Sequence, residues 1–207
     1  MTFYHCETNR MTLMNIGWSR QHRWASDGSE LKGLIGAIRK GHRSGRTLSK
    51  KGDRMVRSPE VDQAVGEAKQ LLRDHGYDCN TTAEDLVRWF EADTPFDEGF
   101  GLDEVLKDRL ILVHELVEIE NVKEKGIALT RDVIVKNLEN VDDAHMIATE
   151  IELSLAASMK DVEHLRDRLE NIRMWSEDDT VTPENKEKYR RMHSETLEFL
   201  EGLEKRP

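Results

Sequence analysis

Cysteine is scarce in this chain: Cys6 and Cys79 are the only two among 207 residues, and they form no CxxC pair. This scarcity argues against a disulfide framework and against a structural zinc site built on cysteine pairs. Such cysteine usage is typical of proteins in a reducing compartment, so we expect a cytoplasmic protein.

Long apolar runs are also lacking. Charged residues make up 35% of the sequence against 37% hydrophobic residues. No apolar stretch approaches the roughly 20 residues that span a bilayer. Residues 1–10 contain no apolar segment ending at a small-residue cleavage site, so we expect no secretory signal. The sequence therefore predicts no membrane partner.

The net charge of −10 is unevenly distributed. Residues 1–54 contain 11 Lys/Arg and 4 Asp/Glu, whereas the remaining 153 residues contain 20 Lys/Arg and 37 Asp/Glu. The first part is rich in Gly, Ser and Arg and has little apolar periodicity, so it buries too little surface to offset the entropy of ordering. The sequence predicts a basic, largely disordered segment over 1–54 and an acidic helical domain over 55–207.

Three interpretations of this basic segment stay open. It could be an arm that contacts the nucleic-acid backbone through its cations, or a solvated tail, or sequence upstream of a true start at Met55. The candidate nucleic-acid contacts are Arg39, Lys40, Arg43 and Arg46.

From Ser58 onward the sequence has the pattern of consecutive helices, and no strand-like alternation occurs. Six helices are predicted from their start signals: Ser58-Pro59, Thr81 with Glu84, about Asp103, Thr130, Ser158 with Asp161, and Thr182-Pro183. The third helix, to about Lys123, and the fourth, to about Ser158, carry the longest apolar stripes. We therefore predict an all-α helical bundle of about six helices centred on this antiparallel pair.

Four carboxylates stand at matched positions on the two central helices. Glu115 with Glu118, and Glu139 with Asp142, are facing pairs three residues apart. At about 1.5 Å per residue, the first pair lies about 9 and 14 Å from the connecting turn and the second about 12 and 17 Å. Carboxylates at one level are usually screened by a cation, a proton or water, so the pattern predicts a site for Mg²⁺ or Mn²⁺.

The pattern Glu115-x-x-Glu118 followed by Glu139-x-x-Asp142 resembles the ExxE…ExxD signature of the MazG-like all-α nucleoside triphosphate pyrophosphohydrolases. The resemblance implies that the four acidic residues hold magnesium ions, which bind a triphosphate and activate water. It covers about residues 111–146. His114 stands where the family usually has the first of two glutamates, and no base-recognising residues can be identified.

A second interpretation uses the histidines. His114 and Glu118, four residues apart, could be joined by His145 and by Asp142 or Glu150. Such mixed nitrogen and oxygen ligands suit zinc, manganese or iron. Asp142-x-x-His145 is similar to the Glu-x-x-His motif of di-iron bundles, but those need two such motifs and this chain has one.

A third interpretation holds that no metal binds. On a helical wheel Glu115 and Glu118 fall opposite the apolar stripe that includes Leu110, where solvated charges are ordinary. The chain would then be a non-catalytic interaction or regulatory protein, forming a homo-oligomer through an apolar helix face. The sequence thus leaves a metal-dependent phosphohydrolase and a binding protein as alternatives.

Overall fold

The computed structural model describes residues 58–94, 101–177 and 181–204, and within these ranges the protein is all-α, with eight helices and no strand. The helices are α2 (Pro59–Asp74), α3 (Ala83–Glu91), α4 (Leu102–Val105), α5 (Arg109–Glu124), α6 (Val133–Lys136), α7 (Leu138–Met159), α8 (Val162–Glu177) and α9 (Pro183–Glu204). The prediction of an all-α fold is confirmed. The candidate nucleic-acid residues Arg39, Lys40, Arg43 and Arg46 lie outside the described residues.

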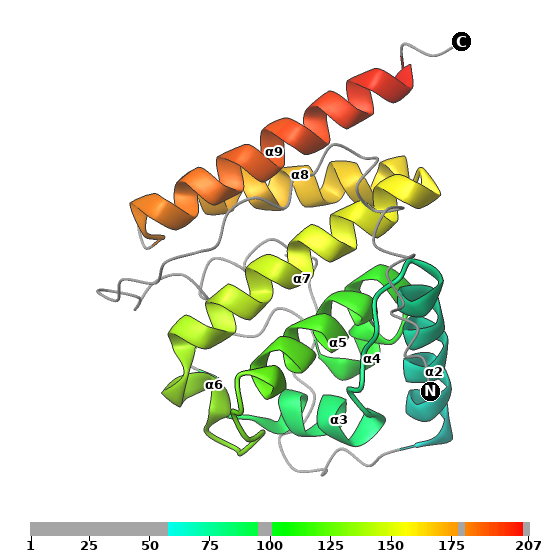
Figure 1. The fold of residues 1–207 in the computed structure, drawn as a ribbon, viewed down its shortest axis with the longest axis vertical. Coiled ribbons are helices and arrows are strands. Elements are labelled where there is room, and N and C mark those ends of the chain that lie inside the picture. Colours follow the sequence, from blue (N-terminus) through cyan, green and yellow to red (C-terminus); the bar gives the residue numbers. More distant parts are fainter. Residues whose placement is uncertain (1–57, 95–100, 178–180, 205–207) are drawn as a thin grey trace, which may run out of the picture.

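Helices α5 and α7 form the centre of the molecule and share the largest helix–helix contact (Figure 1). They run antiparallel: at one end of the pair Lys125, just after α5, binds Asp143 near the start of α7 at 2.9 Å. At the other end His114, early in α5, contacts Glu152, late in α7, at 2.8 Å. Each side chain on the inner face of α5 is therefore placed against a defined level of α7.

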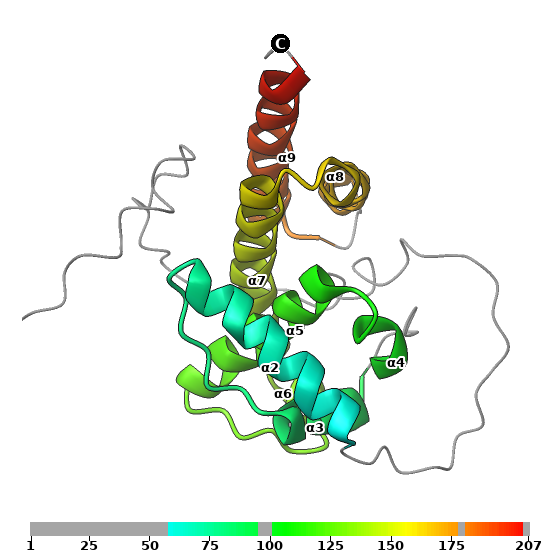
Figure 2. The same ribbon diagram turned by 90° about the vertical axis from the view of Figure 1, so that its right-hand side faces the viewer.

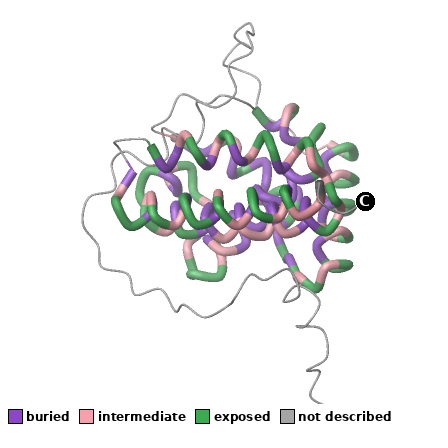
Figure 3. Tube along the Cα trace, turned by 90° about the horizontal axis from the view of Figure 1, so that it is seen from above, coloured by how far each residue is buried: buried purple, intermediate pink, exposed green. Residues whose placement is uncertain are grey.

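The remaining helices cover the two sides of this pair. Helices α2, α3 and α4 pack against α5, while α8 and α9 pair with each other and lie against α7 (Figures 1 and 2). Buried residues face the inside of the helical bundle and exposed residues face its outer surface (Figure 3). The inner faces of α5, α7, α8 and α9 therefore share one interior.

Several of the predicted helix ends agree with the structure. Pro59 occupies the first position of α2, and Gly76, with φ of 78°, follows its end in a backbone conformation that favours glycine. Thr182 accepts a hydrogen bond from the backbone N–H of Asn185 at 3.2 Å, as expected of the residue that starts α9. In each case a local signal determined the local structure.

The expected cap of the second helix was wrong by one residue. Thr82, rather than Thr81, accepts from the backbone N–H of Asp85, and Asp85 accepts in return from the N–H of Thr82. The Thr81 hydroxyl is buried and donates to Glu120 of α5 at 2.8 Å. A tertiary hydrogen bond thus decided which of two equivalent threonines became the cap.

The two central helices are each shorter than predicted. Asp108 interrupts the segment that begins near Asp103, because its carboxylate accepts from the N–H groups of Leu110 and Ile111 and starts a new helix, α5. Asn137, in a non-helical conformation with its amide donating to the Val133 carbonyl, separates α6 from α7. Residues that bond to nearby backbone compete in this way with a continuous helix.

Helix α5 is buried on nearly all sides, and this corrects the expectation of a solvated acidic face. Glu115 and Glu118 are each only 7% exposed. Because α2, α3 and α4 cover α5 on the side away from α7, no face of the middle of this helix reaches solvent freely. The two glutamates are therefore part of the interior.

No described helix is long and apolar enough to cross a membrane. Two large hydrophobic side chains are exposed in the described ranges, Val135 of α6 and Leu197 of α9. They lie on different helices, so the expected self-association through an apolar face stays a prediction.

Replacing Leu110 by alanine should lower the free energy of unfolding by about 2–5 kcal/mol, the usual loss for a buried leucine. Leu110 is 3% exposed, whereas Leu197, at 42%, is the matched control and its alanine variant should stay within about 0.5 kcal/mol of wild type. Urea denaturation of both variants measures the difference. Equal, small losses would show that Leu110 is outside the core.

Candidate metal centre

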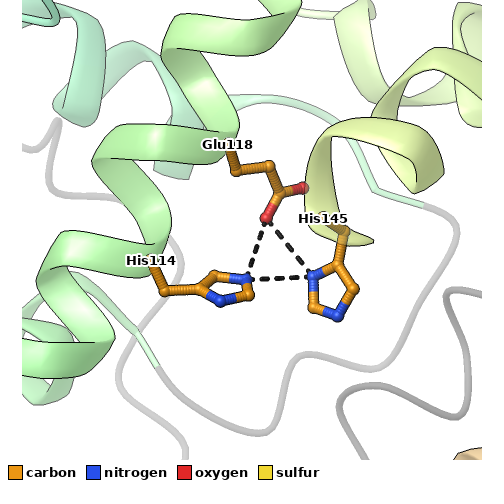
Figure 4. Close-up of side chains that lie close together, drawn as sticks. All are labelled: His114, Glu118 and His145. Atoms are coloured by element: carbon orange, nitrogen blue, oxygen red, sulfur yellow. Dashed lines mark hydrogen bonds and ion pairs between the residues drawn. The ribbon is translucent and has the colours of Figure 1, made fainter. Parts of the chain in front are cut away.

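Two histidines and one glutamate converge between α5 and α7 (Figure 4). His114 and Glu118 lie one turn apart on α5, and His145 faces them from α7. The Nε2 of His114 lies 3.0 Å from the Nδ1 of His145 and 3.4 Å from the Oε2 of Glu118, and the same His145 nitrogen lies 3.5 Å from that oxygen. Among the described residues, this is the only group of three or more His, Cys, Asp or Glu side chains whose ligand atoms all lie within 4.8 Å of one another. We call these three ligand atoms the triangle.

The dimensions of this triangle suit a metal ion. A tetrahedral centre with bonds of about 2.0–2.1 Å separates its ligand atoms by about 3.3–3.4 Å. The observed separations of 3.0, 3.4 and 3.5 Å surround that value. A first-row divalent ion could therefore contact all three atoms with small side-chain adjustments.

The second ring nitrogen of His114 is held by a buried carboxylate. Its Nδ1 lies 2.8 Å from the Oε2 of Glu152, a residue with no exposed surface. A hydrogen bond from Nδ1–H to a carboxylate leaves the lone pair of Nε2 free to bind a metal, and this combination recurs at protein metal centres. Glu152 thus orients the His114 ring toward the triangle.

Glu152 in turn is fixed by α8. Its Oε1 lies 2.6 Å from the Nε2 of His164, and its Oε2 accepts from Arg168 at 2.5 Å. Burial by itself would raise the pKa of Glu152, but Arg168 and the hydrogen bonds with His114 and His164 hold that pKa well below its usual range. The carboxylate therefore stays ionised although it is buried.

The triangle is strongly polarised even with protein atoms alone. Burial lowers the pKa of His114, but its bonds with Glu118 and Glu152 outweigh burial and raise the pKa to about 9. Burial raises the pKa of Glu118, but the two histidines lower it to about 2. Burial lowers the pKa of His145 to about 4. At neutral pH a protonated His114 therefore lies between an ionised Glu118 and a neutral His145.

Aromatic rings enclose His145 on the side of α8 and α9. The His145 ring meets Trp175 of α8 at 5.5 Å between centroids, and Trp175 meets Tyr189 of α9 at 5.2 Å. The guanidinium of Arg168 lies 5.6 Å from the Trp175 ring. Helices α5, α7, α8 and α9 therefore all contribute to the surroundings of the triangle.

Only some of the residues predicted as metal ligands lie in the triangle. Glu118, His114 and His145 form the triangle, as the second interpretation of the sequence combines them. Asp142 is buried but lies outside that group, with its Oδ2 accepting from Asn185 at 2.5 Å. Glu139 is exposed. The structure does not gather the four predicted carboxylates into one cluster.

Two further predicted candidates also lie outside the triangle. Glu115 is buried and belongs to no group of converging ligands among the described residues. Glu150 is partly exposed, and its Oε1 lies 3.9 Å from a guanidinium nitrogen of Arg191 of α9. The helix period explains why these two side chains are not in the triangle, because consecutive residues of a helix point in directions that differ by about 100° around its axis.

Sequence reasoning missed the second carboxylate of the site. Asp142, His145, Thr149 and Glu152 follow one another at spacings of three and four, so they form a polar stripe along one face of α7, and all four are buried. That stripe was the signal that could have found Glu152. His164 and Arg168 lie on α8 and Tyr189 lies on α9, so no spacing along α7 points to them.

Comparisons of the chain with protein-family models, with curated proteins and with solved structures gave no match. The fold and the site by themselves define an all-α protein with a buried His/Glu cluster that could hold a metal ion.

The raised pKa of His114 predicts a loss of stability of the metal-free protein in alkaline solution. The folded pKa of about 9 exceeds the ordinary 6.5, so the native state holds an extra proton between these values. The contribution is complete below pH 6.5 and is lost as the pH rises through about 9, at up to about 1.4 kcal/mol per pH unit.

Denaturation in EDTA between pH 6.5 and 9.5 measures this decline. His114→Gln should flatten it, whereas His193→Gln, a half-buried histidine outside the cluster, should keep it. If stability declined equally in wild type and in both variants, the decline would come from titrating groups other than His114.

Proposed function

We propose that this protein binds one divalent transition-metal ion through His114, Glu118 and His145. The observation that carries the proposal is the convergence of three buried ligand atoms, 3.0 to 3.5 Å apart, on two packed helices. The hydrogen bond between the far nitrogen of His114 and Glu152 supports it, because such a partner fixes both the ring and its tautomer.

The donor set favours zinc, iron or manganese over magnesium. Two imidazole nitrogens and one carboxylate oxygen suit first-row transition metals, whereas magnesium prefers oxygen ligands and retains several waters. The proposal therefore differs from the magnesium cluster that the pyrophosphohydrolase resemblance implies. That cluster requires Glu139, which is exposed on α7.

The number of converging protein ligands favours a second candidate function, a metal-dependent hydrolase. Structural zinc sites usually have four protein ligands, whereas catalytic ones have three and keep a position for water or substrate. The triangle supplies three. A metal-bound water at such a position is a nucleophile at neutral pH, and phosphate esters are among the substrates it could attack.

Zn²⁺ or Co²⁺ should stabilise the protein, because an ion bound by the native state alone shifts the unfolding equilibrium. At 100 times the dissociation constant the gain should be about 2.7 kcal/mol. Equilibrium dialysis with metal analysis should find one ion per chain. NaCl at matched ionic strength should not reproduce the effect.

Two variants distinguish the competing sites. His145→Gln should abolish the response to Zn²⁺, and Glu139→Gln, an exposed carboxylate of the same helix, should leave it intact. Stabilisation by Mg²⁺ that disappears in Glu139→Gln would overturn the proposal and favour the four-carboxylate cluster.

A further inference from the structure

The buried polar atoms without a hydrogen-bond partner among the described residues include the Oδ1 of Asp142 and the hydroxyl of Tyr189, on the two helices α7 and α9. Asp142 is 2% exposed and Tyr189 is fully buried. A buried polar group without a partner destabilises the folded state by about 1–3 kcal/mol. Because the charge of Asp142 also acts on the Tyr189 hydroxyl, one bound molecule could satisfy both groups.

Both groups lie beside the proposed metal centre. Asp142 precedes His145 by three residues, so the two side chains are neighbours on the buried face of α7. Tyr189 packs on Trp175, which packs on His145. The charges of Asp142 and Glu118 act on the Tyr189 hydroxyl, and the charge of Glu118 acts on Asp142.

Asp142 is close to the triangle without belonging to it. No oxygen of Asp142 lies within 4.8 Å of all three ligand atoms, so the carboxylate is too far away to share the ion directly. Burial raises the pKa of the Asp142 carboxyl to about 7, and in its ionised form the Oδ2 accepts from Asn185 and the Oδ1 is the free acceptor. A molecule placed between the ion and Asp142 would need a hydrogen to donate to Oδ1.

We propose that the fourth ligand of the ion is a water molecule held by Asp142 and Tyr189, an inference that rests on the proposed metal site. The water would bind the ion through its oxygen, donate a hydrogen bond to the Oδ1 of Asp142 and accept one from the Tyr189 hydroxyl. Water fits because it is both donor and acceptor, whereas a carboxylate side chain in this position would have no hydrogen to donate to the Oδ1 of Asp142.

The consequence is that α9 completes a centre whose ligands come from α5 and α7. Asn185 fixes the orientation of Asp142, and Tyr189 closes the other side of the water. Charged neighbours of the Asp142 carboxyl are Asp143, Lys188 and Glu118. The fourth position is thereby an exchangeable one, where a small anion or a substrate oxygen could replace the water.

Cobalt is the probe, because Co²⁺ replaces zinc and its visible absorption reports the coordination number. Wild type should bind Co²⁺, and azide, a small anion that displaces metal-bound water, should shift the absorption. Failure of wild type to bind Co²⁺ would overturn the metal site itself. Binding of Co²⁺ with a spectrum indifferent to azide would overturn only the water position.

Tyr189→Phe tests the hydroxyl. It should leave the metal-free protein as stable as wild type or more so, because an unpartnered buried group is removed, but lower the Co²⁺ affinity about 10–100-fold. Tyr77→Phe is the control: that hydroxyl accepts from Asn121 at 3.3 Å, so its loss should affect both forms equally and leave the affinity unchanged. Unchanged affinity in Tyr189→Phe would overturn the proposal.

Asp142→Asn tests the acceptor, with Glu139→Gln on the same helix as control. Asp142→Asn should weaken Co²⁺ binding about 10–100-fold while the spectrum remains that of a centre with the same ligands. If Asp142 were itself the fourth ligand, the variant would change the spectrum of the centre and open a position to azide that wild type lacks, which would overturn the water position. Thermal unfolding of each metal-free variant checks that it folds.

Discussion

The structure depends on the neutralisation of Glu152, an ionised carboxylate with no exposed surface. Transfer of an isolated carboxylate from water to a protein interior is unfavourable by several kcal/mol even after relaxation, so its partners have to be present in the folded state. They come from α5 and α8 and include His114 and Arg168. One buried charge on α7 therefore determines how α5 and α8 are placed around it.

The same charge links stability to chemistry. Glu152 orients His114, and His114 with Glu118 and His145 forms the triangle that could hold a metal ion. A bundle whose only requirement was stability would fill this region with apolar side chains, since replacing a buried ion pair by well-packed hydrophobic residues is often neutral or stabilising. The retention of a polar interior is the physical reason for seeking a function here.

The helices could be predicted well from the sequence, and the candidate site only partly. Pro59 and Thr182 gave reliable boundaries because capping involves residues close in the chain. Asp108 and Asn137 broke predicted helices because either residue can bond to nearby backbone or point to solvent, and sequence does not say which. Likewise Glu139 and Glu118 look equivalent in an acidic pattern, although one is exposed and the other buried.

By itself the sequence determined the helical class, several helix boundaries and the presence of His114, Glu118 and His145 on the two central helices. Tertiary structure decided that α2, α3 and α4 would bury the outer face of α5, and that α8 and α9 would bring Arg168 and Tyr189 to α7. The reason is physical. Helix period and capping depend on neighbours within one or two turns, whereas the burial of a charge such as that of Glu152 depends on partners a dozen or more residues away.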